Sequence, residues 1–214
     1  FKKNQSFGNI FGILFLSFLN RYFEILKWKN LASNVSSISV FEATKQVLAA
    51  LTLGVFTPVG VGEYAAKALY YKKSNTGEIV FLNLICNGIQ MVATSFFGIL
   101  SMLFLGYYLW FGCSIGLAVV LFAFVYFTKK IKIKGYTFQN FIVKINSIPK
   151  KIHQKNIVLG FLRYLVFTHQ YYFLLLIFDV NLPYFPLIST IMLVYLLASI
   201  IPSFQFLDFA LKGS

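Results

Sequence analysis

Charged residues are scarce in this chain of 214 residues, and acidic residues are the scarcest of them. Only 12% of the residues are charged, 58% are hydrophobic, and Asp and Glu together number six. A water-soluble domain usually carries about 25% charged and about 45–50% apolar residues. A chain of this length has too little interior to hide so much Phe, Leu and Ile, so its surface must be apolar too. The composition therefore excludes an ordinary soluble enzyme and a disordered chain, and it predicts a protein that lies mostly in lipid.

Cysteine and histidine are equally sparse. Cys86 and Cys113 lie in apolar stretches with no His or acid at ligand spacing, so they are typical of small apolar packing residues and not of a disulfide scaffold or a metal site. His153 and His169 are isolated as well, and we expect no metal and no cofactor. No Ser/His/Asp set, carboxylate pair or phosphate-binding loop is evident, so we expect no catalytic residues and no enzyme activity.

Basic residues dominate the charge. Nineteen Lys and Arg give a net charge of +13, which in a soluble chain would indicate nucleic acid. Here the basic residues stand between long apolar runs, so they predict positive-inside topology and contact with anionic lipid headgroups, without a nucleic-acid partner. Residues 129–155 hold eight lysines and no acid, and we expect them to form a basic cytoplasmic loop. Lys72 and Lys73 lie two spans earlier and should face the same side.

Long uncharged runs define the expected helices. Ile79–Thr128 contains 50 residues without a charge. As one helix this run would measure about 75 Å against roughly 30 Å of hydrocarbon, so two antiparallel spans with a turn near Gly106–Gly112 are required. An amphipathic tract over 138–148 should lie flat on the membrane. Further apolar helices are expected over residues 8–27, 41–56, 63–71, 156–178 and 184–200.

The spans together predict an all-α, polytopic transmembrane bundle of the cytoplasmic (inner) membrane, forming a single integral membrane domain over residues 1–214. The chain begins with Phe1 and not Met, and Ser214 directly follows a helix-like segment. We therefore expect a piece of a longer membrane protein.

Polar residues inside the apolar helices are candidates for function. Asn20, Glu24 and Lys27 share one helical face; they form either an interfacial helix end with local ion pairing or a face turned toward the bundle interior. A second stripe recurs at steps of four, three and four along the span that follows Ile79, and it predicts either packing between helices or the lining of a path for polar headgroups. That stripe consists of Asn83, Asn87, Gln90 and Thr94.

Arg163 and Gln170 are seven residues apart and also share a face. Arg163 should lie about 10 Å into its span, where a cation is costly and is a functional candidate by default. The alternative is that its side chain reaches back to the cytoplasmic headgroups.

Two helix breaks resemble one another. In each, a proline is followed five or six residues later by an acid, and a lysine follows four residues after the acid, on the same helical face. Two broken helices in corresponding halves are typical of a transporter repeat, so we expect two re-entrant-like segments in a pseudo-repeat. The alternative is a simple kink that places each pair at the membrane surface. The breaks are marked by Pro58, Gly60, Gly62 and Pro202, and the charged pairs are Glu63 with Lys67 and Asp208 with Lys212.

Three stretches resemble the membrane region of lysylphosphatidylglycerol synthases and related flippase-like integral membrane proteins. They are residues 20–28, residues 56–67, and residues 162–172 together with residues 200–203 and Asp208. The chain departs from that pattern where Val59 and Val61 fill the broken loop and Lys67 supplies the cation. The resemblance implies an all-helical bundle with two membrane-embedded broken segments and a role in moving lipids or lipid-linked molecules. The soluble aminoacyl-transfer domain of the synthases has no counterpart here.

The leading hypothesis is a flippase-like protein that lets an anionic or zwitterionic lipid headgroup cross the membrane through a polar cleft. The alternative is a non-transporting scaffold that docks a lipid- or glycan-modifying membrane enzyme through residues 129–155, and a membrane enzyme acting on lipid is a third. In the leading hypothesis the substrate path consists of Glu63, Lys67, Asp208, Lys212, Arg163, Gln170, Asn87 and Gln90.

Overall fold

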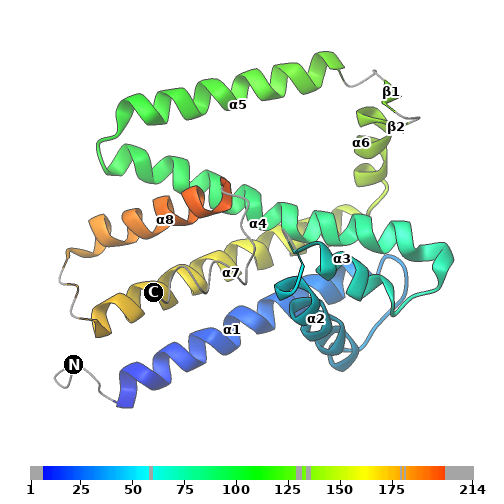
Figure 1. Ribbon diagram of the computed structural model, residues 1–214, viewed down its shortest axis with the longest axis horizontal. Helices are drawn as coiled ribbons and strands as arrows, with labels where there is room; N and C mark the ends of the chain where they lie inside the picture. The colour runs from blue at the N-terminus through cyan, green and yellow to red at the C-terminus, as the bar shows by residue number, and fades with distance from the viewer. Residues whose placement is uncertain are drawn as a thin grey trace.

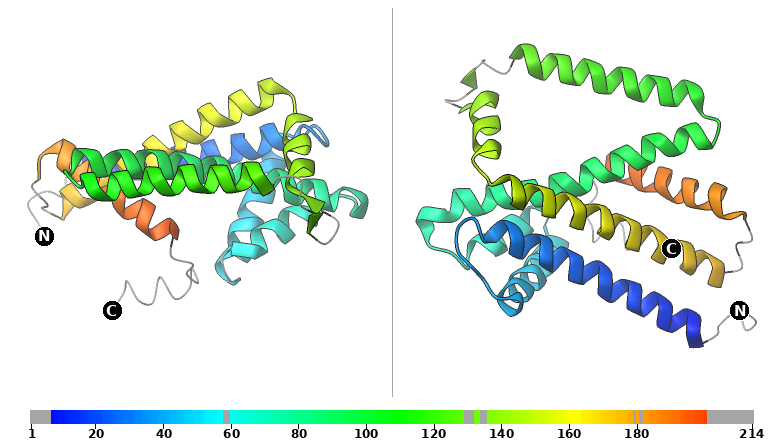
Figure 2. Two further views of the ribbon diagram at one scale, coloured as in Figure 1. Left: turned by 90° about the horizontal axis from the view of Figure 1, so that it is seen from above. Right: turned by 180° about the vertical axis from the view of Figure 1, so that it is seen from behind.

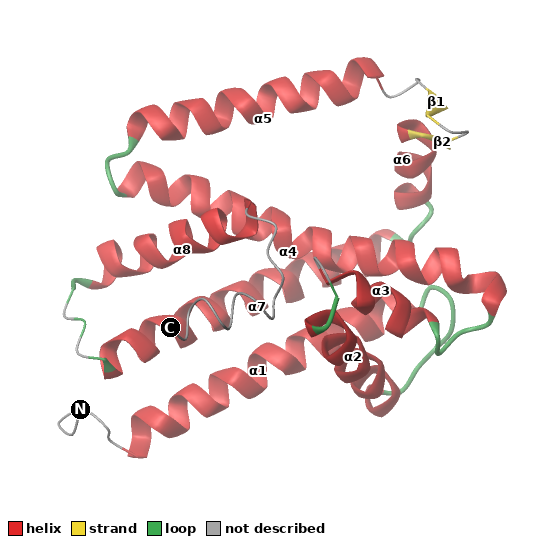
Figure 3. Ribbon diagram, in the orientation of Figure 1, coloured by secondary structure: helices red, strands yellow, loops and turns green. Residues whose placement is uncertain are grey.

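The computed structural model describes residues 7–57, 60–128, 132–133, 136–178, 180 and 182–200. Apart from one small antiparallel ribbon, the regular secondary structure within them is helical, so the expected all-α class is confirmed (Figures 1 and 3). The helices are α1 (Phe7–Ala32), α2 (Val40–Val55), α3 (Val61–Ala68), the 3₁₀ helix η2 (Lys73–Asn75), α4 (Thr76–Phe104), α5 (Tyr108–Thr128), α6 (Phe138–Asn146), α7 (Lys150–Ile177) and α8 (Tyr184–Ile200). The ribbon pairs β1 (Lys132–Ile133) with β2 (Tyr136–Thr137).

The long helices lie roughly side by side (Figure 1). α1 packs against α7, which runs in the opposite direction, and α8 packs along α4. α2 and α3 form a short hairpin to one side of this layer, in contact with α1 and α4 (Figure 2, left). In the described part of the chain, α5 and the run Lys73–Phe104, which contains α4, are long and apolar enough to cross a membrane.

Lysines gather at one end of the layer. The last turn of α1, the segment after α3 and the first turns of α7 lie at the right of Figure 1, and they carry Lys29, Lys72, Lys73, Lys150 and Lys151. The opposite end holds the start of α1, the α4–α5 turn and the α7–α8 connection. The described residues of these segments include no Lys or Arg. Within the described part of the chain, the two ends of the layer therefore differ in charge.

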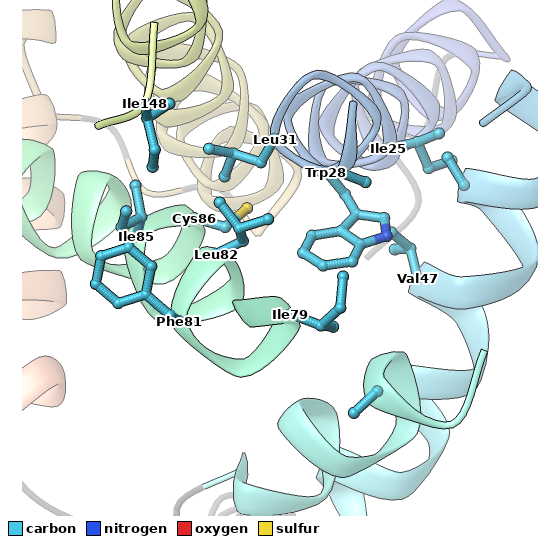
Figure 4. Close-up of a cluster of buried hydrophobic side chains, with 13 residues drawn as sticks. Ile25, Trp28, Leu31, Val47, Ile79, Phe81, Leu82, Ile85, Cys86 and Ile148 are labelled. Atoms are coloured by element: carbon cyan, nitrogen blue, oxygen red, sulfur yellow. The ribbon is translucent and has the colours of Figure 1, made fainter. Parts of the chain in front are cut away.

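The main core lies toward the basic end, between α1, α2 and α4 (Figure 4). Trp28, Leu31 and Ala32 of α1 are fully buried there, against Leu82 of α4. The prediction that the first helix ends at residue 27 is therefore wrong. α1 continues to Ala32 because its polar residues find partners on other helices, while its apolar ones form the core.

The α2–α3 hairpin turns tightly at the predicted break. Thr57 Oγ1 donates to the Leu53 carbonyl at 2.9 Å and accepts the Gly62 N–H at 2.7 Å, and Gly60 adopts φ of +66° at the N-cap of α3. A Cβ on Gly62 would lie 2.4 Å from the Leu53 carbonyl oxygen, and one on Gly54 would lie 2.7 Å from Glu63 Cγ. Glycine is thus required at Gly62, where a side chain would meet the backbone of α2, while a side chain on Gly54 would displace that of Glu63.

The predicted amphipathic tract is also helical. It forms α6, whose Phe141 and Ile145 pack against the main core. α5 behaves differently, because none of its 21 residues is buried. It joins α4 through a turn at Gly106, where φ is +80°, within the predicted turn region.

Candidate functional site

Arg163, near the middle of α7, is the centre of a polar cluster between α1, α4 and α7. Its Nε donates to Asn20 Oδ1 at 3.0 Å, its Nη2 lies 3.2 Å from Glu24 Oε2, and its Nη1 lies 3.5 Å from Gln90 Oε1. Glu24 also pairs with Arg21, at 2.9 Å. The Arg163 side chain is only 18% exposed. It therefore turns into the bundle and does not reach back to the helix end.

The members of this cluster lie at one level of the bundle. Counted from the basic ends of their helices at 1.5 Å per residue, Asn20, Gln90 and Arg163 lie about 18, 21 and 20 Å in. Three helices thus bring polar side chains to the same depth, far from either end of the layer.

A cavity of about 400 Å³ opens beside this cluster. Of the described residues that line it, none is acidic, and the polar ones are the guanidinium of Arg163, the amides of Asn20, Gln90 and Gln170, and two tyrosines. The lining residues are Ile13, Asn20, Gln90, Arg163, Phe167, Gln170, Tyr171, Leu174 and Tyr195. We call this space the Arg163 cavity.

The residues at the Arg163 cavity have hydrogen-bond donors that the described part of the chain leaves without partners. The guanidinium of Arg163 has five N–H donors, and its hydrogen bonds to Asn20, Glu24 and Gln90 use three of them. Gln90 Nε2 is buried and has no hydrogen-bond partner among the described residues. Buried donors are normally satisfied, so this arrangement favours an acceptor-rich ligand such as a phosphate.

Gln170 lies farther along the same cavity. Its Nε2 donates to Ser17 Oγ of α1 at 2.6 Å. Arg163 and Gln170 line the same cavity, which is consistent with the shared helical face that their spacing predicts.

A second polar cluster surrounds Lys67 of α3. Its Nζ donates to Asn83 Oδ1 at 2.6 Å and lies 4.5 Å from the centre of the Trp28 ring. The indole N–H of Trp28 donates to Gln46 Oε1 at 2.6 Å, and the Tyr71 hydroxyl donates to the same oxygen at 3.1 Å. Lys67 is thus buried with an amide and an aromatic ring as partners, and no carboxylate of the described residues contacts it.

Glu63, one turn before Lys67, contacts a different residue of α4. Its Oε2 accepts from Asn87 Nδ2 at 3.3 Å. The expectation that Glu63 and Lys67 pair with each other is wrong, since the ion pairs of the described residues join Glu24 to Arg21 and to Arg163. α3 packs along α4 so that each charged side chain meets its own asparagine, and the polar stripe of α4 supplies both.

Lys27 is, with Lys67, the other buried cation of the described residues. It is 1% exposed, and its Nζ donates to the Cys86 carbonyl at 3.0 Å. Lys27 and Glu24 are both buried, so the polar face of the first helix turns toward the bundle interior and is not an exposed helix end at the membrane interface. The sequence pattern marked this face, yet Asn20, Glu24 and Lys27 were not among the predicted path residues.

The charges of the two clusters do not balance. The cations are Arg21, Lys27, Lys67 and Arg163, and the carboxylates are Glu24 and Glu63. The described part of the site therefore carries an excess of two positive charges, which favours an anion.

Part of the predicted substrate path and of the predicted helix breaks lies outside the described residues. This holds for Pro202, Asp208 and Lys212, and for Pro58 in the first break. The expected pseudo-repeat of the two breaks therefore stays a prediction. Among the described residues, no group of three His, Cys, Asp or Glu side chains could hold a metal ion.

No protein-family model, no curated protein and no solved structure matches this chain. The resemblance to flippase-like proteins therefore stays a prediction from the residues that carry it.

Proposed function

We propose that this chain is a flippase-like integral membrane protein that binds the anionic headgroup of a phospholipid or lipid-linked substrate in the Arg163 cavity and lets it cross the cytoplasmic membrane. The observation that carries the proposal is the lining of that cavity, in which a guanidinium and three amides meet and none of the described residues is acidic.

Length and surface support the membrane placement. Two helices have the length and composition of spans, and α5 exposes bulky apolar side chains on all sides, including Phe122, Phe124 and Phe127. Such a surface is unstable in water and stable in lipid. The basic end of the layer then faces the cytoplasm, in keeping with the excess of Lys in cytoplasmic loops.

The depth of Arg163 supports a functional role for it. At about 20 Å from the basic end it lies near the middle of a bilayer whose hydrocarbon is roughly 30 Å thick. A cation there is costly, and such residues face bundle interiors or water-filled paths. The excess positive charge of the site favours a phosphate over a cationic or neutral group.

The α2–α3 hairpin fits a re-entrant segment. Its first helix has 16 residues, or about 24 Å, which is too short to cross the hydrocarbon alone. The hairpin returns to the end it left, and it carries Glu63 and Lys67 inward to meet Asn87 and Asn83.

We infer a simple exchange at the cavity. An entering phosphate takes the free N–H groups of Arg163 and Gln90 Nε2, and it competes with Glu24 for the guanidinium. Glu24 keeps Arg21 as its partner, so the carboxylate is not left unpaired when the anion arrives. The acyl chains stay in lipid while the headgroup passes through the polar interior.

The test is lipid translocation by the full-length protein in vesicles that contain acyl-labelled phosphatidylglycerol. Arg163→Gln should lower the rate by about 10- to 100-fold, because hydrogen bonds to a charged group contribute about 1.5–3 kcal/mol. The matched control is Lys155→Gln, which removes an exposed cation of the same helix α7 outside the Arg163 cavity and should change the rate by less than about twofold. Equal rates for Arg163→Gln and wild type, with both proteins folded by thermal melting, would exclude the proposal.

A scaffold that docks a membrane enzyme is the second candidate, and the uncovered α5 favours it. Replacing the lysines at 129, 130 and 134 with Gln separates the two functions. Loss of a partner enzyme from the purified complex, with lipid movement retained and insensitive to Arg163→Gln, would favour the scaffold.

A further inference from the structure

A second hollow lies on the opposite side of α4 from the hairpin, along the seam of α4, α6 and α7. It has a volume of about 530 Å³ and is lined almost entirely by apolar side chains. We call it the seam groove; its walls include Gly88, Val92, Phe141, Ile145, Ile157 and Phe161. It shares no described lining residue with the Arg163 cavity, so it is a separate site.

Gly88 gives the seam groove part of its depth. A Cβ built on Gly88 would meet no atom within 4 Å, whereas one on Gly160 or Gly98 would collide with a neighbouring side chain. Gly88 is therefore not required for helix packing. It leaves open space on the wall of an apolar groove.

Cations stand at the α6 side of the groove. Lys144 Nζ lies 4.6 Å from the centre of the Phe81 ring, and Phe81 stacks edge-on against Phe141 of the groove wall, with 5.4 Å between ring centres. Lys150 and Lys151 begin α7, two turns before Ile157, and both are exposed. The described residues from 138 to 156 include no acid. An apolar slot thus lies beside an exposed basic surface.

We infer that the seam groove holds one acyl chain of an anionic phospholipid from the leaflet at the basic end, with the lipid phosphate among Lys144, Lys150 and Lys151. The inference rests on the membrane placement proposed above but not on translocation. The apolar lining matches a hydrocarbon chain, and the lysines match a phosphate, so the two halves of one lipid satisfy both surfaces. The bound lipid fixes α6 against α4 and α7.

The experiment measures thermal unfolding of the full-length protein in dodecylmaltoside micelles with three added probes. These are palmitoyl lysophosphatidylglycerol, palmitoyl lysophosphatidylcholine with the same chain, and glycerophosphoglycerol with no chain. Wild type should gain several degrees with the first, less with the second and nothing with the third. Equal shifts with the two lysolipids, or a full shift with glycerophosphoglycerol, would overturn the inference.

Two variants locate the effect. Gly88→Leu fills the seam groove and should abolish the shift, and Lys144→Gln should reduce the phosphatidylglycerol shift to that of phosphatidylcholine. The matched control is Gly116→Leu on α5, where a new Cβ also meets nothing within 4 Å, and it should keep the full shift.

A full shift in Gly88→Leu, or an equal loss in Gly116→Leu, would contradict the inference. The inference would also be contradicted if the wild-type protein is a dimer and Gly88→Leu, but not Gly116→Leu, makes it a monomer, because the groove would then hold a second copy of the chain. Lipid translocation by Gly88→Leu should equal that of wild type, so a failure here is distinguishable from a failure of the Arg163 cavity.

Discussion

α4 and α5 are consecutive, long and apolar, yet the protein uses them in opposite ways. In the most apolar window of α4, 44% of the residues are buried, whereas none is buried in α5. α4 contacts α1, α3, α7 and α8, and its Asn83, Asn87 and Gln90 reach the charged groups of the site. α5 has no such polar stripe. Hydrophobicity alone thus indicates that a helix can span, while polar residues at helical spacing indicate which face meets other helices.

The largest expected difference between α4 and α5 comes from truncating one leucine in each helix. Leu82 of α4 is fully buried in the main core, and Leu121 of α5 is exposed. Leu82→Ala should cost about 2–5 kcal/mol of unfolding free energy, because it leaves a cavity in a packed core. Leu121→Ala should change it by less than about 0.5 kcal/mol. Unfolding in mixed micelles of dodecylmaltoside and sodium dodecyl sulfate measures both, and similar losses would refute the contrast.

The next test places a methyl group on a glycine in each region. Gly62→Ala forces a Cβ to within 2.4 Å of the Leu53 carbonyl oxygen and should cost about 1–3 kcal/mol through displacement of the hairpin. Gly116→Ala enters open space on α5 and should leave stability unchanged or raise it by up to about 1 kcal/mol, since Ala favours helix. The same unfolding assay applies. If Gly62→Ala is as stable as wild type, the close contact of α2 with α3 is wrong.

A third test removes a hydrogen-bond acceptor from the core beneath Lys67. Gln46→Met deprives Trp28 Nε1 and the Tyr71 hydroxyl of their shared partner, which should cost about 1–3 kcal/mol. The matched control is Gln154→Met on the exposed face of α7, with an expected change within about 0.5 kcal/mol. A change in Gln46→Met no larger than in the control would show that this network does not stabilise the hairpin against α1.

The smallest expected effect concerns the start of α2, which is capped. Glu42 lies in the first turn of α2, exposed and outside the proposed spans, and its carboxylate accepts a hydrogen bond from the Ser39 backbone N–H at 2.7 Å. This hydrogen bond lowers the pKa of the Glu42 carboxyl below its ordinary 4.5. A lowered folded pKa contributes stability that is present above pH 4.5 and is lost as the pH falls through the folded value. Melting temperatures across this range should fall less for Glu42→Gln than for wild type. Parallel curves would contradict the capping role.

The sequence predicted the helices well where composition changes abruptly. The predicted range 184–200 matches α8, and the aromatic and glycine residues near Gly106 marked the α4–α5 turn. The extension of α1 to Ala32 was missed because Lys27, Lys29 and Asn30 are typical of a helix end in water. Lys27 and Asn30 instead bond to carbonyls far away in the chain, those of Cys86 and Ile152.

Partners that are distant in the chain were also missed at the candidate site. Spacing predicted that Arg163 and Gln170 share a face and that Asn87 and Gln90 do so too. It gave no partner for Arg163, because Glu24 and Asn20 are 139 and 143 residues away, and pattern within one helix carries no information about its neighbours. The expected Glu63–Lys67 pair failed for the related reason that contacts with α4 outweigh a local pairing.

The most direct test of the central claim is thiol accessibility in vesicles, with one position in the Arg163 cavity and one on α5. Gln170→Cys, in a chain whose two native cysteines are replaced, should react with a charged, membrane-impermeant thiol reagent and be protected by inorganic phosphate. The native Cys113, exposed on α5, should react only with a lipid-soluble maleimide. Two results together would contradict a water-filled, anion-binding cavity at the centre of a lipid-embedded bundle. They are no reaction of Gln170→Cys with the charged reagent and reaction of Cys113 with that reagent.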